Sequence, residues 1–207
     1  MDRLGNKDWV SVGYKFLLLL CLLSGLIAYD VATWFMEVLP AIIGLFAVIF
    51  LYSRGVRFSS LLSIVVVFHV LVLTIGGVFT YPRVPFFGPD DFIGDTLDWS
   101  RNNYDKLGHF MQGFTPFIAT AEMLEKKRIL QKGVMMIFLS ISVSLAISAL
   151  YELIEYASLL CLGSGADDFI GAQGDPYDTQ TDIFWALIGA ITASIVYYSF
   201  KHKNHST

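Results

Sequence analysis

Charged residues are scarce in this sequence. Asp, Glu, Lys and Arg make up 15% of its 207 residues, whereas an ordinary soluble domain carries roughly 25%. So few charges exclude a disordered chain and cannot cover a surface that faces water. The two cysteines, Cys21 and Cys161, cannot form a disulfide framework, and we interpret both as packing residues. The formal net charge of −4 gives no reason to expect nucleic acid as a partner.

Apolar residues dominate instead. They make up 55% of the chain, and its mean hydropathy is +0.60. A helix needs about 20 mainly apolar residues to cross a bilayer. Six stretches meet or approach this length: about 15–34, 37–53, 58–80, 107–124, 133–160 and 182–200. The sequence therefore predicts an all-α fold, a polytopic membrane helix bundle of about six spans that forms one domain over residues 1–207, with membrane lipid as its partner.

Lys and Arg are distributed unevenly between the two sides of the predicted bundle. Eleven of the 14 fall in the N-terminal segment, the loops after the second and fourth spans, and the C-terminal tail. The other three are Arg83, Arg101 and Lys106, in a loop on the opposite side. Because basic residues accumulate on the cytoplasmic side, both termini are predicted to be cytoplasmic. Aspartates gather in the two long outer loops, 81–106 and 161–181.

The fourth predicted span begins with polar residues on one face. Asp105 and His109 are four residues apart, and Gln112 and Pro116 continue the same face. Ionisable residues at the edge of a span mark a functional site by default. The alternative is that Asp105 caps the helix and His109 bonds to a neighbouring backbone group.

The fifth and sixth predicted spans also carry acids at their outer ends. In each, a stripe of residues spaced four apart joins acids to small residues: Ser140, Ser144, Ser148 and Glu152 on the fifth, and Asp178, Asp182, Ala186, Ala190 and Ser194 on the sixth. Small residues allow helix backbones to approach closely, so the two stripes are predicted to pack face to face. The alternative is that the acids reach water at the interface and Asp178 or Thr179 caps the sixth span.

Three separate segments therefore bring acids and one histidine to the same level of the membrane. Like charges disfavour each other's ionised forms, and a bound cation would relieve them. Carboxylates with an imidazole suit a divalent metal ion, which is the candidate cofactor. The predicted metal ligands are Asp105, His109, Glu152, Asp178 and Asp182; Glu152 and His109 are also the candidate catalytic groups, and Gln112, Glu155, Asp175 and Gln180 are candidate binding residues.

Other polar residues in the apolar segments have simpler interpretations. His69 lies in the middle of the third span and is predicted to be a neutral packing residue. Asp30 and Glu37 flank the first outer turn and are predicted to face water. The sequence contains no P-loop, G-x-S-x-G or H-E-x-x-H motif that would indicate a particular reaction.

Three ordered blocks carry a resemblance to a known family. NYDKLGHFMQGF, SALYELIEY and GAQGDPYDTQTDIFWALIGA resemble the YjdF-type family of bacterial inner membrane proteins, a domain of unknown function. The resemblance implies a multi-pass protein of the bacterial inner (plasma) membrane, but no reaction. A second similarity, in D-K-x-x-H-F at 105–110 with a later Glu and Asp, is to VanZ-like proteins.

Three functions fit these residues. The first is a metal-dependent enzyme that acts on a lipid-linked or amphipathic substrate. The second is a transporter coupled to a cation or to protons. The third is a structural or partner-binding protein whose acids hold helices together. A transporter requires polar residues that continue to the inner face, whereas a pocket closed on that side favours the enzyme or a receptor.

Overall fold

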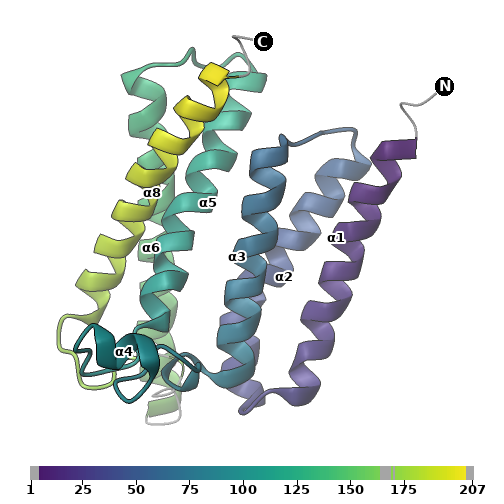
Figure 1. Ribbon diagram of the computed structural model, residues 1–207. Helices are drawn as coiled ribbons and strands as arrows, with labels where there is room; N and C mark the ends of the chain where they lie inside the picture. Colours follow the sequence, from purple (N-terminus) through teal and green to yellow (C-terminus); the bar gives the residue numbers. More distant parts are fainter. Residues whose placement is uncertain (1–4, 164–168, 170, 204–207) are drawn as a thin grey trace.

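Six long helices stand side by side in the computed structural model, which describes residues 5–163, 169 and 171–203 (Figure 1). Their bounds are α1 (Gly5–Leu23), α2 (Val31–Ser53), α3 (Ser60–Phe79), α5 (Tyr104–Lys126), α6 (Val134–Leu162) and α8 (Asp178–Lys203). Within the described residues, short helices also lie in the connections: η1 (Ser24–Ile27), η2 (Tyr81–Arg83) and α4 (Phe92–Thr96). The residues described contain no strand, which confirms the all-α prediction.

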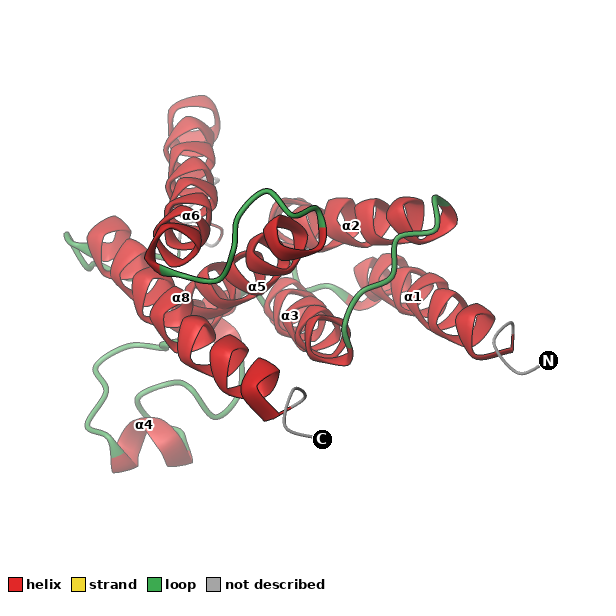
Figure 2. Ribbon diagram, turned by 90° about the horizontal axis from the view of Figure 1, so that it is seen from above, coloured by secondary structure: helices red, strands yellow, loops and turns green. Residues whose placement is uncertain are grey.

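Five helices among the described residues are long and apolar enough to cross a membrane, namely α1 with η1, α2, α3, α6 and α8. The sixth long helix, α5, is as long as α2, at 23 residues, but its sequence is more polar. It lies near the middle of the bundle and contacts α3, α6 and α8 (Figure 2). Neighbouring helices thus cover its polar side chains, as a bilayer requires. The six-span arrangement, with α5 as a span, remains a prediction.

The break between the first two spans lies earlier in the sequence than predicted. The predicted break lies at residues 35–36, but α1 begins at Gly5 and α2 already begins at Val31. The backbone N–H of Thr33 donates to Asp30 Oδ1 at 2.7 Å, which makes Asp30 the N-cap of α2. This hydrogen bond lowers the pKa of Asp30. The apolar residues after Asp30 were assigned to the first span because hydropathy alone does not detect a cap.

Two other residues differ from their predicted environments. Glu37 was predicted to face water but is fully buried in α2, because the helix starts six residues before it. Its Oε1 accepts a hydrogen bond from the backbone N–H of Tyr81 at 3.5 Å. Cys161 was predicted to be a packing residue but is exposed near the end of α6, whereas Cys21 is buried as expected.

The helices α5 and α8 pack closely against each other. A Cβ atom on Gly113 of α5 would lie 1.8 Å from the carbonyl oxygen of Ala186, and one on Gly189 of α8 would lie 2.0 Å from that of Phe110. Only glycine permits backbones this close. The two helices are therefore held at a distance that side chains at these positions would prevent.

The predicted partner for the small-residue stripe of α8 was α6. The serines of the α6 stripe are buried, as are Ala186 and Ala190, and α6 contacts α8. The tightest approach to α8, however, comes from α5 through Gly113. Ser194 is only half-buried, and Ala193 takes the buried position at the next turn. The prediction considered neighbours in sequence and overlooked the glycine on the earlier helix.

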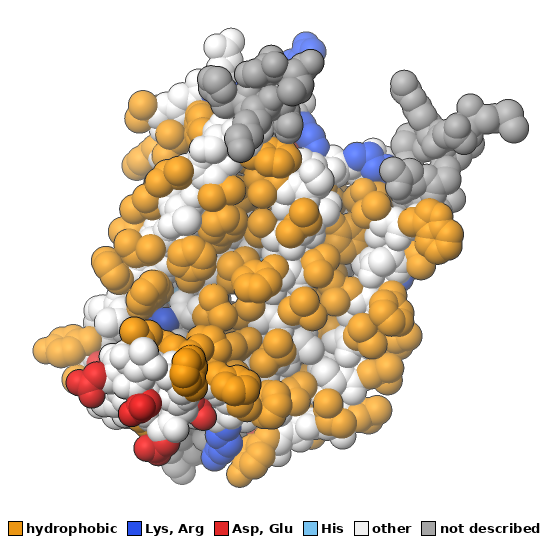
Figure 3. Space-filling view, in the orientation of Figure 1, with side chains coloured by type: hydrophobic (Ala, Val, Ile, Leu, Met, Phe, Trp, Pro, Cys, Tyr) orange, Lys and Arg blue, Asp and Glu red, His pale blue; other side chains and the backbone are white. Residues whose placement is uncertain are grey.

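Charge separates along the bundle axis. In the space-filling view an apolar belt covers the middle of the molecule, and the visible acidic side chains gather at the end that carries α4 (Figure 3). We call this end the α4 end; α1 begins and α8 ends at the opposite end (Figure 1). The first turns of α5 and α8 and the last turns of α6 all lie at the α4 end, where the predicted site residues are.

Candidate functional site

Two clusters of buried ionisable side chains lie at the α4 end. The Asp cluster consists of Asp105, Asp178 and Asp182, and the His/Glu cluster of His109, Glu152 and Glu155. In each cluster, one potential ligand atom from every residue lies within 4.8 Å of the others. All six residues are buried. The structure therefore brings together the acids and the histidine that the sequence placed on three separate spans.

Helix geometry places these residues. Asp105 and His109 occupy successive turns at the start of α5, and Asp182 lies one turn into α8. Because glycines let α5 and α8 approach closely, His109 Nε2 lies 3.6 Å from Asp182 Oδ2. Glu152 enters from the last turns of α6 on the other side of the imidazole.

The Asp cluster is neutralised by cations of the chain itself. Lys106 Nζ lies 2.9 Å from Asp178 Oδ1 and 2.8 Å from Asp182 Oδ1. Arg101 forms an ion pair with Asp105, four residues later, and another with Asp178 Oδ1 at 2.7 Å. Each of the three aspartates therefore has a buried or nearly buried partner of opposite charge.

Arg101 also connects the two loops of the α4 end. Its guanidinium donates to the carbonyl oxygens of Gly171 at 3.0 Å and Ala172 at 3.1 Å, in the segment before α8. Burial alone would lower the pKa of Arg101, but the carboxylates of Asp105 and Asp178 outweigh it and raise that pKa above its ordinary value. Arg101 therefore stays charged and serves as a fixed counter-ion.

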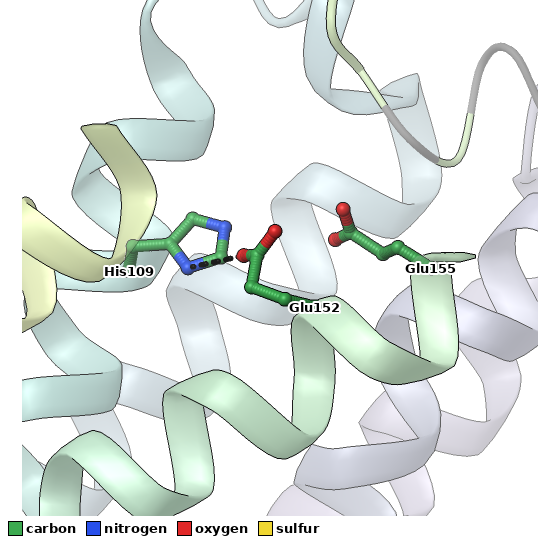
Figure 4. Close-up of side chains that lie close together, drawn as sticks. All are labelled: His109, Glu152 and Glu155. Atoms are coloured by element: carbon green, nitrogen blue, oxygen red, sulfur yellow. Dashed lines mark ion pairs between the residues drawn. The ribbon is translucent and has the colours of Figure 1, made fainter. Parts of the chain in front are cut away.

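The His/Glu cluster has no comparable partner. His109 Nδ1 faces Glu152 Oε1 at 3.6 Å, and the Glu155 carboxylate lies beyond Glu152 (Figure 4). This distance exceeds the usual hydrogen-bond length of about 3.2 Å. Neither atom has a hydrogen-bond partner within the part of the chain that the structure describes. In the same residues, no Lys or Arg forms an ion pair with Glu152 or Glu155.

Asp182 joins the two clusters. Its Oδ1 atom binds Lys106, and its Oδ2 atom approaches the imidazole of His109. The imidazole therefore lies between a carboxylate that is already paired and one that is not. The predicted proximity of Glu152 to His109 is confirmed.

A cavity of about 180 Å³ opens beside the His/Glu cluster. Glu152 and Glu155 line it from α6, and Asp175 and Thr179 line it from the segment around the start of α8. Asp175 is partly exposed, and Arg101 Nη1 lies 3.5 Å from its carboxylate. Gln180, a candidate binding residue, is exposed on the first turn of α8. Both glutamates can therefore be reached from this cavity.

Arg101 and Lys106 were missed as site residues. The sequence analysis counted them only as outer-side charges. One signal was available: Arg101 and Lys106 are two of only three basic residues on that side. Tyr151 was also missed, although its ring packs edge-on against His109 with the centroids 6.2 Å apart.

Comparisons with known proteins identify the family of the chain. No solved structure matches the chain. It is 43% identical to the inner membrane protein YjdF of Escherichia coli strain K12 over 180 residues, which cover 86% of this chain and 84% of that protein. The similarity to VanZ-like proteins stays a prediction. Residues 11–203 match the family described as "Predicted membrane protein (DUF2238)". The chain therefore belongs to this family of membrane proteins, DUF2238.

Proposed function

We propose that the His/Glu cluster binds a divalent metal ion and that the protein is a metal-dependent membrane enzyme with a lipid-linked or amphipathic substrate. The observation that supports this is the pair His109 Nδ1 and Glu152 Oε1, both buried, 3.6 Å apart and without hydrogen-bond partners. A buried polar atom without a partner costs about 1–3 kcal/mol, and more if it is charged. A cation bound between them and Glu155 removes that cost.

The donor set suits catalysis as well as binding. One imidazole and two carboxylates are three protein ligands, the number that leaves an open position for water or substrate. A metal ion there activates water or polarises a phosphoryl or acyl group. The other ring nitrogen, Nε2, lies 3.6 Å from Asp182 Oδ2, so a carboxylate stands on the side where a metal-bound histidine usually has its second partner. Asp105 and Asp178, by contrast, are occupied by Arg101 and Lys106, so we assign them a positioning role.

The interior of α5 favours an enzyme over a transporter. Toward the opposite end, Phe117, Ile118 and Ala121 are fully buried in an apolar core. The next acid, Glu122, accepts hydrogen bonds from Ser59 at 2.8 and 2.6 Å and pairs with Lys126. Along α5, apolar side chains therefore separate the polar residues of the α4 end from Glu122, whereas a transport path that follows this helix would require polar residues throughout.

The proposed location is the bacterial inner membrane, with cytoplasmic termini and the α4 end on the outer side. Cysteine labelling tests this orientation in a background where both native cysteines are replaced by serine. A membrane-impermeant maleimide on intact cells is expected to label Asp95→Cys, in the α4 loop, and to label Lys127→Cys only after permeabilisation. The reverse pattern would place the site in the cytoplasm.

Metal content tests the site itself. The detergent-purified protein is expected to contain about one divalent ion per chain, and Glu152→Ala is expected to lose it. Asp95→Ala removes an exposed acid from the same end and serves as the matched control. Equal metal content in all three proteins would refute the assignment, as would a wild-type protein that binds none after incubation with Mg²⁺, Mn²⁺, Ca²⁺ or Zn²⁺.

A further inference from the structure

A second, larger cavity lies between α2 and α3 on one side and α5 and α6 on the other. Its volume is about 660 Å³, and its walls come from α2, α3, α5 and α6. Apolar side chains form most of the lining, including Met36, Val48, Leu73, Pro116, Ile147 and Ile154. We call it the membrane groove. From Met36 to Val48 it extends over 12 residues of α2, about 18 Å at 1.5 Å per residue.

The membrane groove begins where the His/Glu cluster ends. Tyr151 lines the groove, directly precedes Glu152 in α6 and packs its ring against His109. Gln112 lines it from α5, three residues after His109. A molecule in the groove therefore lies within one helical turn of the proposed metal site.

Several polar atoms on the groove wall are not satisfied by the protein. Tyr151 OH and Gln112 Oε1 are buried and have no hydrogen-bond partner among the described residues, and the same holds for Thr115 Oγ1 and His69 Nε2. Pro40 and Pro116 also line the groove, within α2 and α5. Each proline removes the N–H that would bond to the carbonyl four residues earlier. A pure hydrocarbon would leave the Tyr151 hydroxyl without an acceptor, so the fitting ligand has polar groups as well as an apolar chain.

The size of the groove is that of a small-molecule site. A volume of this order is typical of small-molecule sites, which range over about 300–1,000 Å³. The length of about 18 Å is also slightly more than half of the roughly 30 Å hydrocarbon core, that is, the depth of one leaflet.

We propose that the membrane groove binds one acyl chain of a glycerophospholipid from the leaflet at the α4 end. This inference rests on the proposed function, since it identifies the substrate class of that site. The chain lies along Leu73, Pro116 and Ile147, and the glycerol linkage lies at the level of Gln112 and Tyr151. This placement would bring the phosphate to His109, Glu152 and Glu155, the residues that would hold the metal.

Gly44 allows the groove to be filled. It lines the groove from α2, and a Cβ atom built on it meets no atom within 4 Å. Gly44→Phe therefore occupies the space of the acyl chain without a clash in the backbone. Gly13 of α1 has the same open surroundings but does not line the groove, so Gly13→Phe is the matched control. Ile147→Trp fills the groove from the opposite wall, should Gly44→Phe fail to give a monodisperse protein.

Native mass spectrometry with added palmitoyl-oleoyl phosphatidylglycerol measures the binding. The wild-type protein and Gly13→Phe are expected to retain one lipid per chain. Gly44→Phe and Ile147→Trp are expected to bind it about tenfold more weakly or worse, since displacing two methylene groups is enough for that loss. Equal retention by all four proteins would overturn the proposal.

Metal content, measured on the same samples, separates this inference from the proposed function. If both hold, Gly44→Phe keeps its metal while it loses the lipid. A wild-type protein that binds metal but retains no lipid contradicts the groove proposal alone. A protein that retains the lipid, loses it in Gly44→Phe and never binds metal supports the groove and contradicts the metal site.

Discussion

The Asp cluster and the His/Glu cluster lie at the same end of the bundle, yet only the Asp cluster has cationic side chains that balance its charge within the described residues. In the Asp cluster, Lys106 and Arg101 lie within ion-pair distance of all three acids. In the His/Glu cluster, the atoms that face each other have no partner in the residues described. The first arrangement holds α5, α8 and the loop before α5 together. The second leaves ligand atoms free, which is what a binding site requires.

The difference shows how one cluster supports the other. Asp182 is fixed by Lys106 through one oxygen and approaches His109 with the other. Asp182 thus connects the neutralised cluster to the imidazole of the open one. Buried ion pairs are weak evidence for stability in themselves, but removal of one partner is costly because it leaves a buried charge alone. In the metal-free protein, neutralising substitutions in the two clusters should therefore change the free energy of unfolding in different directions: a loss in the Asp cluster, and no loss or a gain in the His/Glu cluster.

The largest effect is expected for Lys106→Met, which removes the cation shared by Asp178 and Asp182. Methionine fills a similar volume, so the loss is mainly electrostatic. The free energy of unfolding is expected to fall by about 3–5 kcal/mol, seen as a lower melting temperature in detergent and a smaller monodisperse fraction. Lys127→Met, at an exposed position in the loop after α5, is the control and should leave both unchanged.

A rescue variant shows whether charge is the cause. Lys106→Met combined with Asp182→Asn removes one of the two acids that lose their partner, so part of the stability should return. A double variant less stable than Lys106→Met alone would mean that Lys106 acts by packing, and the Asp cluster would not be a charge-balanced unit.

The second largest effect is expected for Glu152→Gln. Whether this variant is more or less stable than the wild type depends on whether metal is bound. In chelator-treated protein the variant should be at least as stable as the wild type, because a neutral amide replaces a carboxylate that has no cation. With metal at 100 times its dissociation constant, the wild type should gain about 2.7 kcal/mol that the variant does not. Melting temperatures with and without metal measure both quantities.

Asp105→Asn provides the contrast from the other cluster. It breaks the pair with Arg101, so it should lower the melting temperature equally with and without metal, and the increment caused by metal should remain. If metal changes neither wild type nor variant, and Glu152→Gln destabilises as Asp105→Asn does, both clusters are structural and the distinction between them is wrong.

The third prediction concerns the spacing of α5 and α8, on which both clusters depend. Gly113→Ala would place a Cβ atom 1.8 Å from the Ala186 carbonyl oxygen, so the helices must separate. Overpacking of this kind costs about 1–3 kcal/mol. It should also weaken metal binding, since His109 moves with α5. Gly13→Ala, which meets no atom within 4 Å, should be neutral on both counts; equal losses in the two variants would show that the effect is not one of spacing.

Much of this arrangement was predictable from the sequence. Apolar length indicated the long helices, and the spacing of Asp105, His109, Glu152 and Asp182 near helix ends indicated that they share one level. These signals are local or depend only on the direction of each helix. The start of α2 at Val31, directly after its N-cap Asp30, was missed because one side-chain hydrogen bond, rather than hydropathy, determines it.

The division into two clusters was not predictable. It depends on which cation reaches which acid, and Lys106 meets Asp178 and Asp182 only because α5 and α8 are close neighbours. That closeness depends in turn on Gly113 and Gly189, which are unremarkable glycines in the sequence until their partners are known. The membrane groove likewise arises from the spaces between four helices, and no pattern within one helix indicates it.

The smallest effect is expected at the edge of the Asp cluster. Asp175 is partly exposed, and Arg101 approaches it at 3.5 Å, farther than it approaches Asp178. Its Oδ1 also accepts the backbone N–H of Tyr177 at 2.8 Å, which an asparagine oxygen can still do. Asp175→Asn should therefore lower the free energy of unfolding by less than about 1 kcal/mol, as for exposed pairs. Asp178→Asn, which weakens bonds to both Arg101 and Lys106, should cost clearly more; equal losses would extend the charge-balanced unit to its solvent-exposed edge.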